Sequence, residues 1–119
     1  MNKVERNKEG FLVSLRQWNK SVAADIAYRE GIDLTNEHWE IINLLQNFYK
    51  ETDTVPEMRP LANLISKKLG KEKSKSVRLM RLFGGSPAKI AAKISGLPRP
   101  TIIFIYHQKR RATKDLFYN

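Results

Sequence analysis

Apolar residues recur every three or four positions along most of this chain, which is the period of an amphipathic α-helix. The strongest pattern runs from residue 34 to residue 49, where Thr35 is a good N-cap residue. Two glutamates near its start suit the positive end of a helix dipole. A wide apolar stripe predicts the central core helix of the fold, and it consists of Ile41, Ile42, Leu45, Phe48 and Tyr49.

Shorter segments repeat this spacing on either side. A helix is expected from about residue 19 to residue 30, where Gly31 follows as a stop signal. Two more are expected at residues 61–69 and 74–83, with Gly70 and a short turn between them. Two short helices, a turn containing glycine and a basic second helix have the outline of a helix-turn-helix.

The stretch from Leu82 to Phe104 predicts a last helix followed by an arm. Ser86 can cap that helix, Pro87 suits its first position and Gly96 can end it. The two prolines that follow fix an extended backbone with few hydrogen bonds to the body, so the arm can reach outward.

The N-terminal residues 4–13 suggest a small β-hairpin with its turn at residues 7–10, and Trp18 is expected to pack under it. Together these segments predict a mainly α fold. It is a small orthogonal bundle of about five helices with an N-terminal β-hairpin, a helix-turn-helix-like unit and a C-terminal arm.

Composition narrows the classes of function. A chain of 119 residues is one domain, and the absence of cysteine excludes disulfides, thiolate zinc sites and iron–sulfur clusters. No apolar run approaches the roughly 20 residues that cross a bilayer, and no signal-peptide core is present. We therefore expect a soluble cytoplasmic protein, without a metal or a cofactor.

The formal net charge of +10 is unevenly distributed. Residues 1–66 contain 8 Lys and Arg against 10 Asp and Glu, whereas residues 67–114 contain 14 against one. A field of that sign attracts nucleic acid, acidic proteins or anionic ligands. Three cations of the basic helix advance by three and share a face, so we expect contacts to DNA phosphates or to an acidic partner, or else a solvated face. The candidate contacts are Lys73, Lys75, Arg78 and Arg81, with Lys109, Arg110 and Arg111 in the tail.

Two long motifs resemble a known family. The central helix and the loop after it read LTNEHWEIINLLQNFY and VPEMRPL, and the last helix and arm read PAKIAAKISGLPRPT. These are similar to signatures of the DsrC/TusE family, the dissimilatory sulfite reductase gamma subunits that carry sulfur on arm cysteines. The resemblance spans roughly residues 11–104. It implies a domain at residues 1–104 with its arm at 97–104, and a C-terminal extension at 105–119.

The two family cysteine positions fall on Ala92 and Ile103. Sulfur transfer needs a thiolate that is both nucleophile and carrier, and neither side chain offers one. The resemblance therefore implies the scaffold of the family without its chemistry, and we predict that the protein is not an enzyme. The partner-binding arm would consist of Leu97, Pro98, Arg99, Pro100 and Thr101.

Relatives in this family dock their arm into dissimilatory sulfite reductase or into sulfurtransferases that serve tRNA thiolation. The resemblance thus implies a non-catalytic partner-binding or regulatory protein of sulfur metabolism, monomeric or weakly oligomeric. The alternative is a helix-turn-helix DNA-binding regulator. Residues 102–106 are β-branched and aromatic, typical of a strand or of a segment that binds a groove; whether they fold back on the body or dock elsewhere stays open.

Two other positions invite a functional interpretation. His38, near the start of the central helix, is predicted to pack and form hydrogen bonds, because no cluster of acids with ligand spacing accompanies it and a general base needs an identifiable partner. Gly84, Gly85 and Ser86, with Lys89 nearby, allow either anion binding or simply a tight turn between helices.

Overall fold

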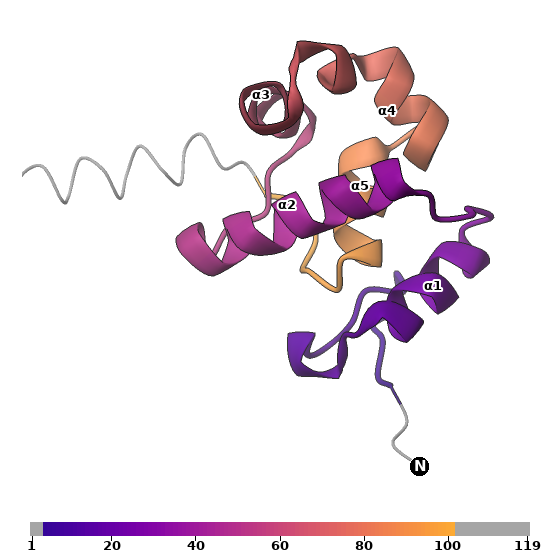
Figure 1. The fold of residues 1–119 in the computed structure, drawn as a ribbon. Coiled ribbons are helices and arrows are strands. Elements are labelled where there is room, and N and C mark those ends of the chain that lie inside the picture. The colour runs from indigo at the N-terminus through magenta and orange to yellow at the C-terminus, as the bar shows by residue number, and fades with distance from the viewer. Residues whose placement is uncertain (1–3, 102–119) are drawn as a thin grey trace, which may run out of the picture.

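The computed structural model describes residues 4–101, which form five α-helices and two short 3₁₀ turns (Figure 1). No strand is assigned within this range, where only isolated β-bridges occur. The elements are η1 (Leu15–Gln17), α1 (Lys20–Arg29), α2 (Asn36–Thr52), α3 (Met58–Leu69), η2 (Lys71–Ser74), α4 (Ser76–Phe83) and α5 (Pro87–Ile94). The expected mainly helical fold is confirmed.

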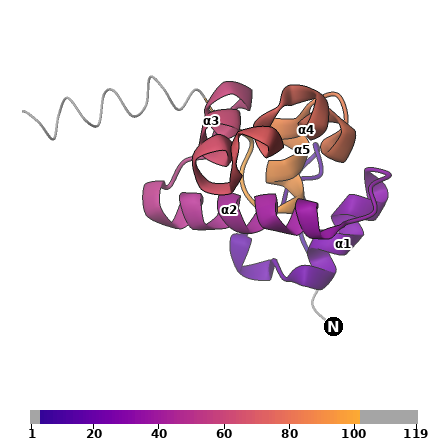
Figure 2. The ribbon, with the colours of Figure 1, turned by 45° about the horizontal axis from the view of Figure 1, so that its top comes forward.

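The short helix α5 lies at the centre of the molecule and contacts α1, α2, α3 and α4 (Figures 1 and 2). Its small side chains Ala91 and Ala92 are fully buried, and so is Ile94. Alanine lets neighbouring backbones approach closely, which explains how one helix of eight residues packs against four others. The sequence had pointed to residues 34–49 as the central helix, but α2 lies across α5 with one face in the core.

Side chains cap the starts of α1 and α2, whereas α3, α4 and α5 have no side-chain cap, and Ser86, the expected cap of α5, makes no capping hydrogen bond. Thr35 and His38 form the two halves of a capping box at the start of α2, and Asp53 ends that helix in the left-handed conformation with φ 58°. Helix α3 begins at Met58, three residues earlier than expected. Pro60 had been taken as a loop residue, yet it lies in the first helical turn, where its missing N–H has no partner to lose.

Residues 4–13 contain no strand, so the predicted N-terminal β-hairpin is not observed. The chain reverses at the expected turn, where the Asn7 side chain accepts hydrogen bonds from Glu9 N and Phe11 N at 2.9 and 3.0 Å. A single antiparallel bridge joins Arg6 to Leu12. Phe11 and Leu12 are adjacent and both buried, which departs from the alternation of a half-buried strand.

Trp18 closes the C-terminal end of α5 instead of packing under a hairpin. Its indole N–H donates to the carbonyl of Ile94 at 2.8 Å. The ring lies so close to Gly96 that a β-carbon there would be 2.4 Å from Trp18 Cδ1. Gly96 also has φ +75°, so both its conformation and its missing side chain are required.

The arm is held at both of its ends as far as it is described. Leu97 is fully buried, and its N–H donates to Ala92 O at 3.0 Å. Thr101 N donates to Val55 O at 3.1 Å, next to a parallel bridge between Thr101 and Pro56. The described arm therefore lies along the body instead of reaching outward, and Ile103 with the rest of the tail lies outside the described residues.

Replacing Gly96 by alanine tests this closure. Gly96→Ala should lower the free energy of unfolding by about 3 kcal/mol or more, since it adds a clash with Trp18 to the cost of a positive φ. Gly31→Ala is the matched control, because Gly31 also has φ +75° but has no atom within 4 Å of an added β-carbon. It should lose only about 1 kcal/mol. Equal losses in urea unfolding would contradict the close approach of Trp18.

Candidate functional site

A shallow groove of about 270 Å³ runs between the arm, the start of α5 and the start of α3. Its apolar surface comes from Met58, Pro87, Ala88 and Pro100. Charged side chains also line it, namely Glu57, Lys89 and Arg99. The groove thus combines part of the predicted arm with residues of two helices that are distant in the sequence.

One carboxylate bridges the two cations of this groove. Glu9 Oε2 lies 3.5 Å from Lys89 Nζ and 3.3 Å from Arg99 Nη1. This contact links the N-terminal turn to α5 and to the arm. All three side chains are more than a third exposed, so each ion pair is expected to contribute little to stability.

The residue at which the resemblance places the inner cysteine of the family lies in the core of this protein. Ala92 is fully buried on α5. A side chain at this position therefore packs between helices and does not face solvent. The outer position, Ile103, follows two residues after Thr101 and lies outside the described residues.

The glycine turn before α5 has an evident conformational role. Gly84 has φ +87° and its N–H donates to Met80 O at 2.7 Å, which ends α4. Lys89, the cation expected to assist an anion there, is already paired with Glu9. These contacts are those of a tight turn between helices, and none of them supports an anion site.

His38 is a buried packing residue with both ring nitrogens engaged. Its Nδ1 accepts from Thr35 N at 3.0 Å, so Nε2, 2.7 Å from Leu82 O, carries the proton and donates. The ring also meets Phe83 edge to face, with centroids 5.0 Å apart. The histidine ties the start of α2 to the end of α4, and the prediction of a packing and hydrogen-bonding role is confirmed.

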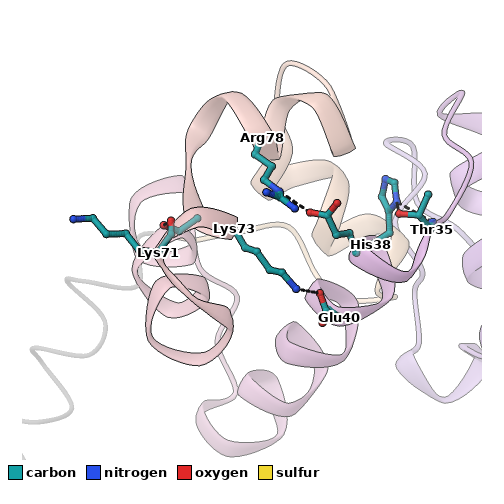
Figure 3. Close-up of polar contacts among 8 residues, drawn as sticks. Thr35, His38, Glu40, Lys71, Lys73 and Arg78 are labelled. Atoms are coloured by element: carbon teal, nitrogen blue, oxygen red, sulfur yellow. Dashed lines mark hydrogen bonds and ion pairs between the residues drawn. The ribbon is translucent and has the colours of Figure 1, made fainter.

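Most of the predicted basic face is occupied by internal ion pairs (Figure 3). Lys73 Nζ lies 2.6 Å from Glu40 Oε1, and Arg78 Nε lies 2.7 Å from Glu37 Oε2. Both glutamates belong to α2. Lys75 pairs with Glu72 at 3.2 Å. Among the described residues, four cations of this region have no ion pair: Lys67, Lys68, Lys71 and Arg81. The tail cations Lys109, Arg110 and Arg111 lie outside that range.

The Arg78–Glu37 contact shifts both groups toward their charged forms. The hydrogen bond from Arg78 is the largest cause that lowers the pKa of Glu37, and partial burial opposes it. The same hydrogen bond raises the pKa of Arg78. Arg78 therefore fastens α4 to α2, as Lys73 fastens η2 to α2.

A buried lysine was missed by the sequence reasoning. Lys93 is only 7% exposed, and its Nζ lies 3.0 Å from Glu30 and 5.3 Å from the centre of the Phe11 ring. The signal was present, because Lys93 falls among the apolar positions of PAKIAAKI. Its partner on α1 could be identified only from the fold.

Within residues 4–101, no group of three His, Asp or Glu side chains is arranged to hold a metal ion. No helix of that range is both long and apolar enough to cross a membrane.

The fold and groove define a small helical protein whose C-terminal arm is docked beside its central helix. The family described as "DsrC like protein" matches residues 1–103, and the chain belongs to this family. Sulfurtransferase TusE of Buchnera aphidicola is 44% identical over 99 residues, covering 83% of this chain and 87% of the relative. Sulfurtransferase TusE of Escherichia coli is 44% identical over 97 residues, covering 82% and 89%.

Solved structures agree. The NMR structure of Allochromatium vinosum DsrC is 42% identical with a TM-score of 0.79, covering 84% of this chain and 89% of that one. The oxidized gamma subunit of the dissimilatory sulfite reductase from Archaeoglobus fulgidus is 31% identical with a TM-score of 0.72, covering 85% and 92%. The resemblance to the DsrC/TusE family is confirmed.

Changing His38 tests its structural role. His38→Ala should lower the free energy of unfolding by about 2 kcal/mol, because one half of the capping box and the donor to Leu82 are both lost. His38→Gln is the conservative control, since glutamine at this helix position can still bond the Thr35 N–H, and it should lose less. An alanine variant as stable as the parent in thermal unfolding would contradict this assignment.

The Glu37 contact predicts a small, signed dependence of stability on pH. The folded-state pKa of Glu37 is lowered from 4.5, so its contribution is fully present above pH 4.5 and is lost as pH falls through the folded value. Glu37→Gln should be slightly less stable than the parent at pH 7, and the difference should disappear in acid. Urea midpoints measured from pH 7 to pH 2.5 would check this, and a difference that grows in acid would contradict it.

Proposed function

We propose that this DsrC-family protein acts in sulfur metabolism as a non-catalytic binding or regulatory protein that does not itself carry sulfur. The observation behind this proposal is the occupancy of the two family cysteine positions. Ala92 is part of the packed core, and Ile103 has no lone pair to offer. With no cysteine in the 119 residues, neither position can form a persulfide.

The docking surface in this proposal is the arm, Leu97 to Thr101. Leu97 is anchored in the core, Thr101 is bonded to the Val55 carbonyl, and the two prolines stiffen the backbone between them. Arg99 stands 65% exposed at the middle of the segment. A segment that is already ordered binds with less loss of conformational entropy, which favours docking over a mobile carrier role.

The partner in this proposal is a protein of the sulfur-relay or sulfite-reductase type, met in the cytoplasm. Relatives of this chain are named sulfurtransferases, and a further solved relative is dissimilatory sulfite reductase I, 32% identical with a TM-score of 0.69. A regulator that lacks the carrier atom would occupy the partner's binding site without delivering sulfur.

DNA binding is the weaker alternative. Helix-turn-helix recognition would need the cations in and just before α4 to be available for phosphates. Lys73, Lys75 and Arg78 instead pair with acids of the same chain. Only Arg81 of the four candidates stays without an ion pair within the described region, so no second function is proposed.

Calorimetric titration of the full chain tests the proposal, with the purified sulfurtransferase or sulfite reductase encoded nearest to its gene as partner. Binding is expected at micromolar concentrations. Pro98→Gly combined with Pro100→Gly should weaken it about 5- to 20-fold, because each change restores freedom to the unbound arm. Val77→Ser, at an exposed site on α4, is the control and should change nothing.

Mass spectrometry after incubation with polysulfide should find no sulfur adduct on the chain. An adduct would contradict the loss of carrier function. The absence of binding to either class of partner would contradict the docking role.

A further inference from the structure

One carboxylate, that of Glu9, contacts two cations that line the groove beside the arm. Glu9 comes from the N-terminal turn, whereas the two cations that it contacts come from α5 and from the arm. A single oxygen, Glu9 Oε2, lies within 3.5 Å of both Lys89 Nζ and Arg99 Nη1. Two cations that converge on one oxygen form a receptor for a carboxylate, and an acidic side chain of another protein satisfies the same geometry.

From this geometry we propose that the groove binds an acidic residue of a partner protein, which displaces Glu9 from Lys89 and Arg99. This inference rests on the proposed function and adds the chemistry of the partner's docking segment. It commits the groove to a protein ligand with one acidic side chain next to an apolar one.

The apolar requirement follows from the walls of the groove. Met58, Pro87, Ala88 and Pro100 line it beside the two cations. A partner residue with an aliphatic or aromatic side chain would bury area there while its neighbouring acid meets the cations. Glu57 also lines the groove and repels a second acid. The groove therefore selects against a purely polyacidic segment.

Displacement of Glu9 breaks only weak ion pairs and requires no change of the backbone. Lys89 and Glu9 are both 38% exposed and Arg99 is 65% exposed, so water already screens these pairs. The turn that carries Glu9 is held by the Asn7 side chain and can keep its conformation while the glutamate side chain rotates. Glu9 is thus a weak internal competitor that an external carboxylate with additional apolar contacts can replace.

The test uses the full ¹⁵N-labelled chain and two synthetic peptides blocked at both ends. One peptide has a single glutamate between leucines in an otherwise Gly and Ser sequence, and the other has glutamine in its place. Titration followed by NMR should shift the amide signals of Gly85, Ala88, Lys89 and Arg99 with the glutamate peptide only. Glu9→Gln should tighten binding about two- to five-fold, because the competitor is removed.

Matched variants separate this effect from general electrostatics. Lys89→Gln with Arg99→Gln should abolish the shifts, whereas Arg81→Gln, which removes an exposed charge outside the groove, should have little effect. Glu51→Gln, an exposed acid without an ion pair among the described residues, is the control for Glu9→Gln and should leave affinity unchanged.

Three outcomes would overturn the proposal. The first is equal binding of the two peptides or the absence of shifts at the groove. The second is an unchanged affinity for Glu9→Gln. The third is a gain in affinity for the glutamate peptide in a Phe104→Ser variant that equals the gain in Glu9→Gln. That result would mean that the chain's own tail occupies the groove. If the glutamate peptide binds but no sulfur-relay partner does, this inference stands and the proposed function is rejected. If a sulfur-relay partner binds but the peptide does not, the proposed function stands and this inference is rejected.

Discussion

The packing of helices around α5 is the constraint on which the rest of the structure depends. Ala91 and Ala92 let neighbouring helices approach closely, and Trp18 covers the end of the helix against Gly96. A larger side chain at Gly96 would push the indole away and expose the Ile94 carbonyl that it now satisfies. Because the arm starts at this point, the same contact sets its direction.

This central role of α5 bears on the chemistry of the family. The inner cysteine position falls on the buried face of the helix, where side-chain volume matters for packing. Ala92 occupies that position and is fully buried. The arm past Gly96 keeps its anchors at Leu97 and Thr101. The fold of the DsrC family thus occurs in a chain that lacks cysteine.

Electrostatic pairing joins the two halves of the chain. The sequence indicated a slightly acidic first half and a strongly basic second half, which predicted a basic surface for an external ligand. In the structure the acids of the first half pair with bases of the second, as Glu37 does with Arg78 and Glu30 with Lys93. These pairs join α4 and α5 to α2 and to the residue that follows α1. Among the described candidates for nucleic-acid contact, Lys73, Lys75 and Arg78 are paired and Arg81 is not.

The sequence by itself determined most of the helices and the absence of cysteine. Local signals are sufficient for these, since the Thr35 cap, the Gly96 stop and the missing cysteines are each visible within a few residues. Only the tertiary structure decided that α5 is central, that Trp18 covers Gly96 and that Glu9 pairs with two cations of the groove beside the arm. Each of these depends on contacts between segments distant along the chain, and hydrophobic period and local propensity contain no information about which segments meet.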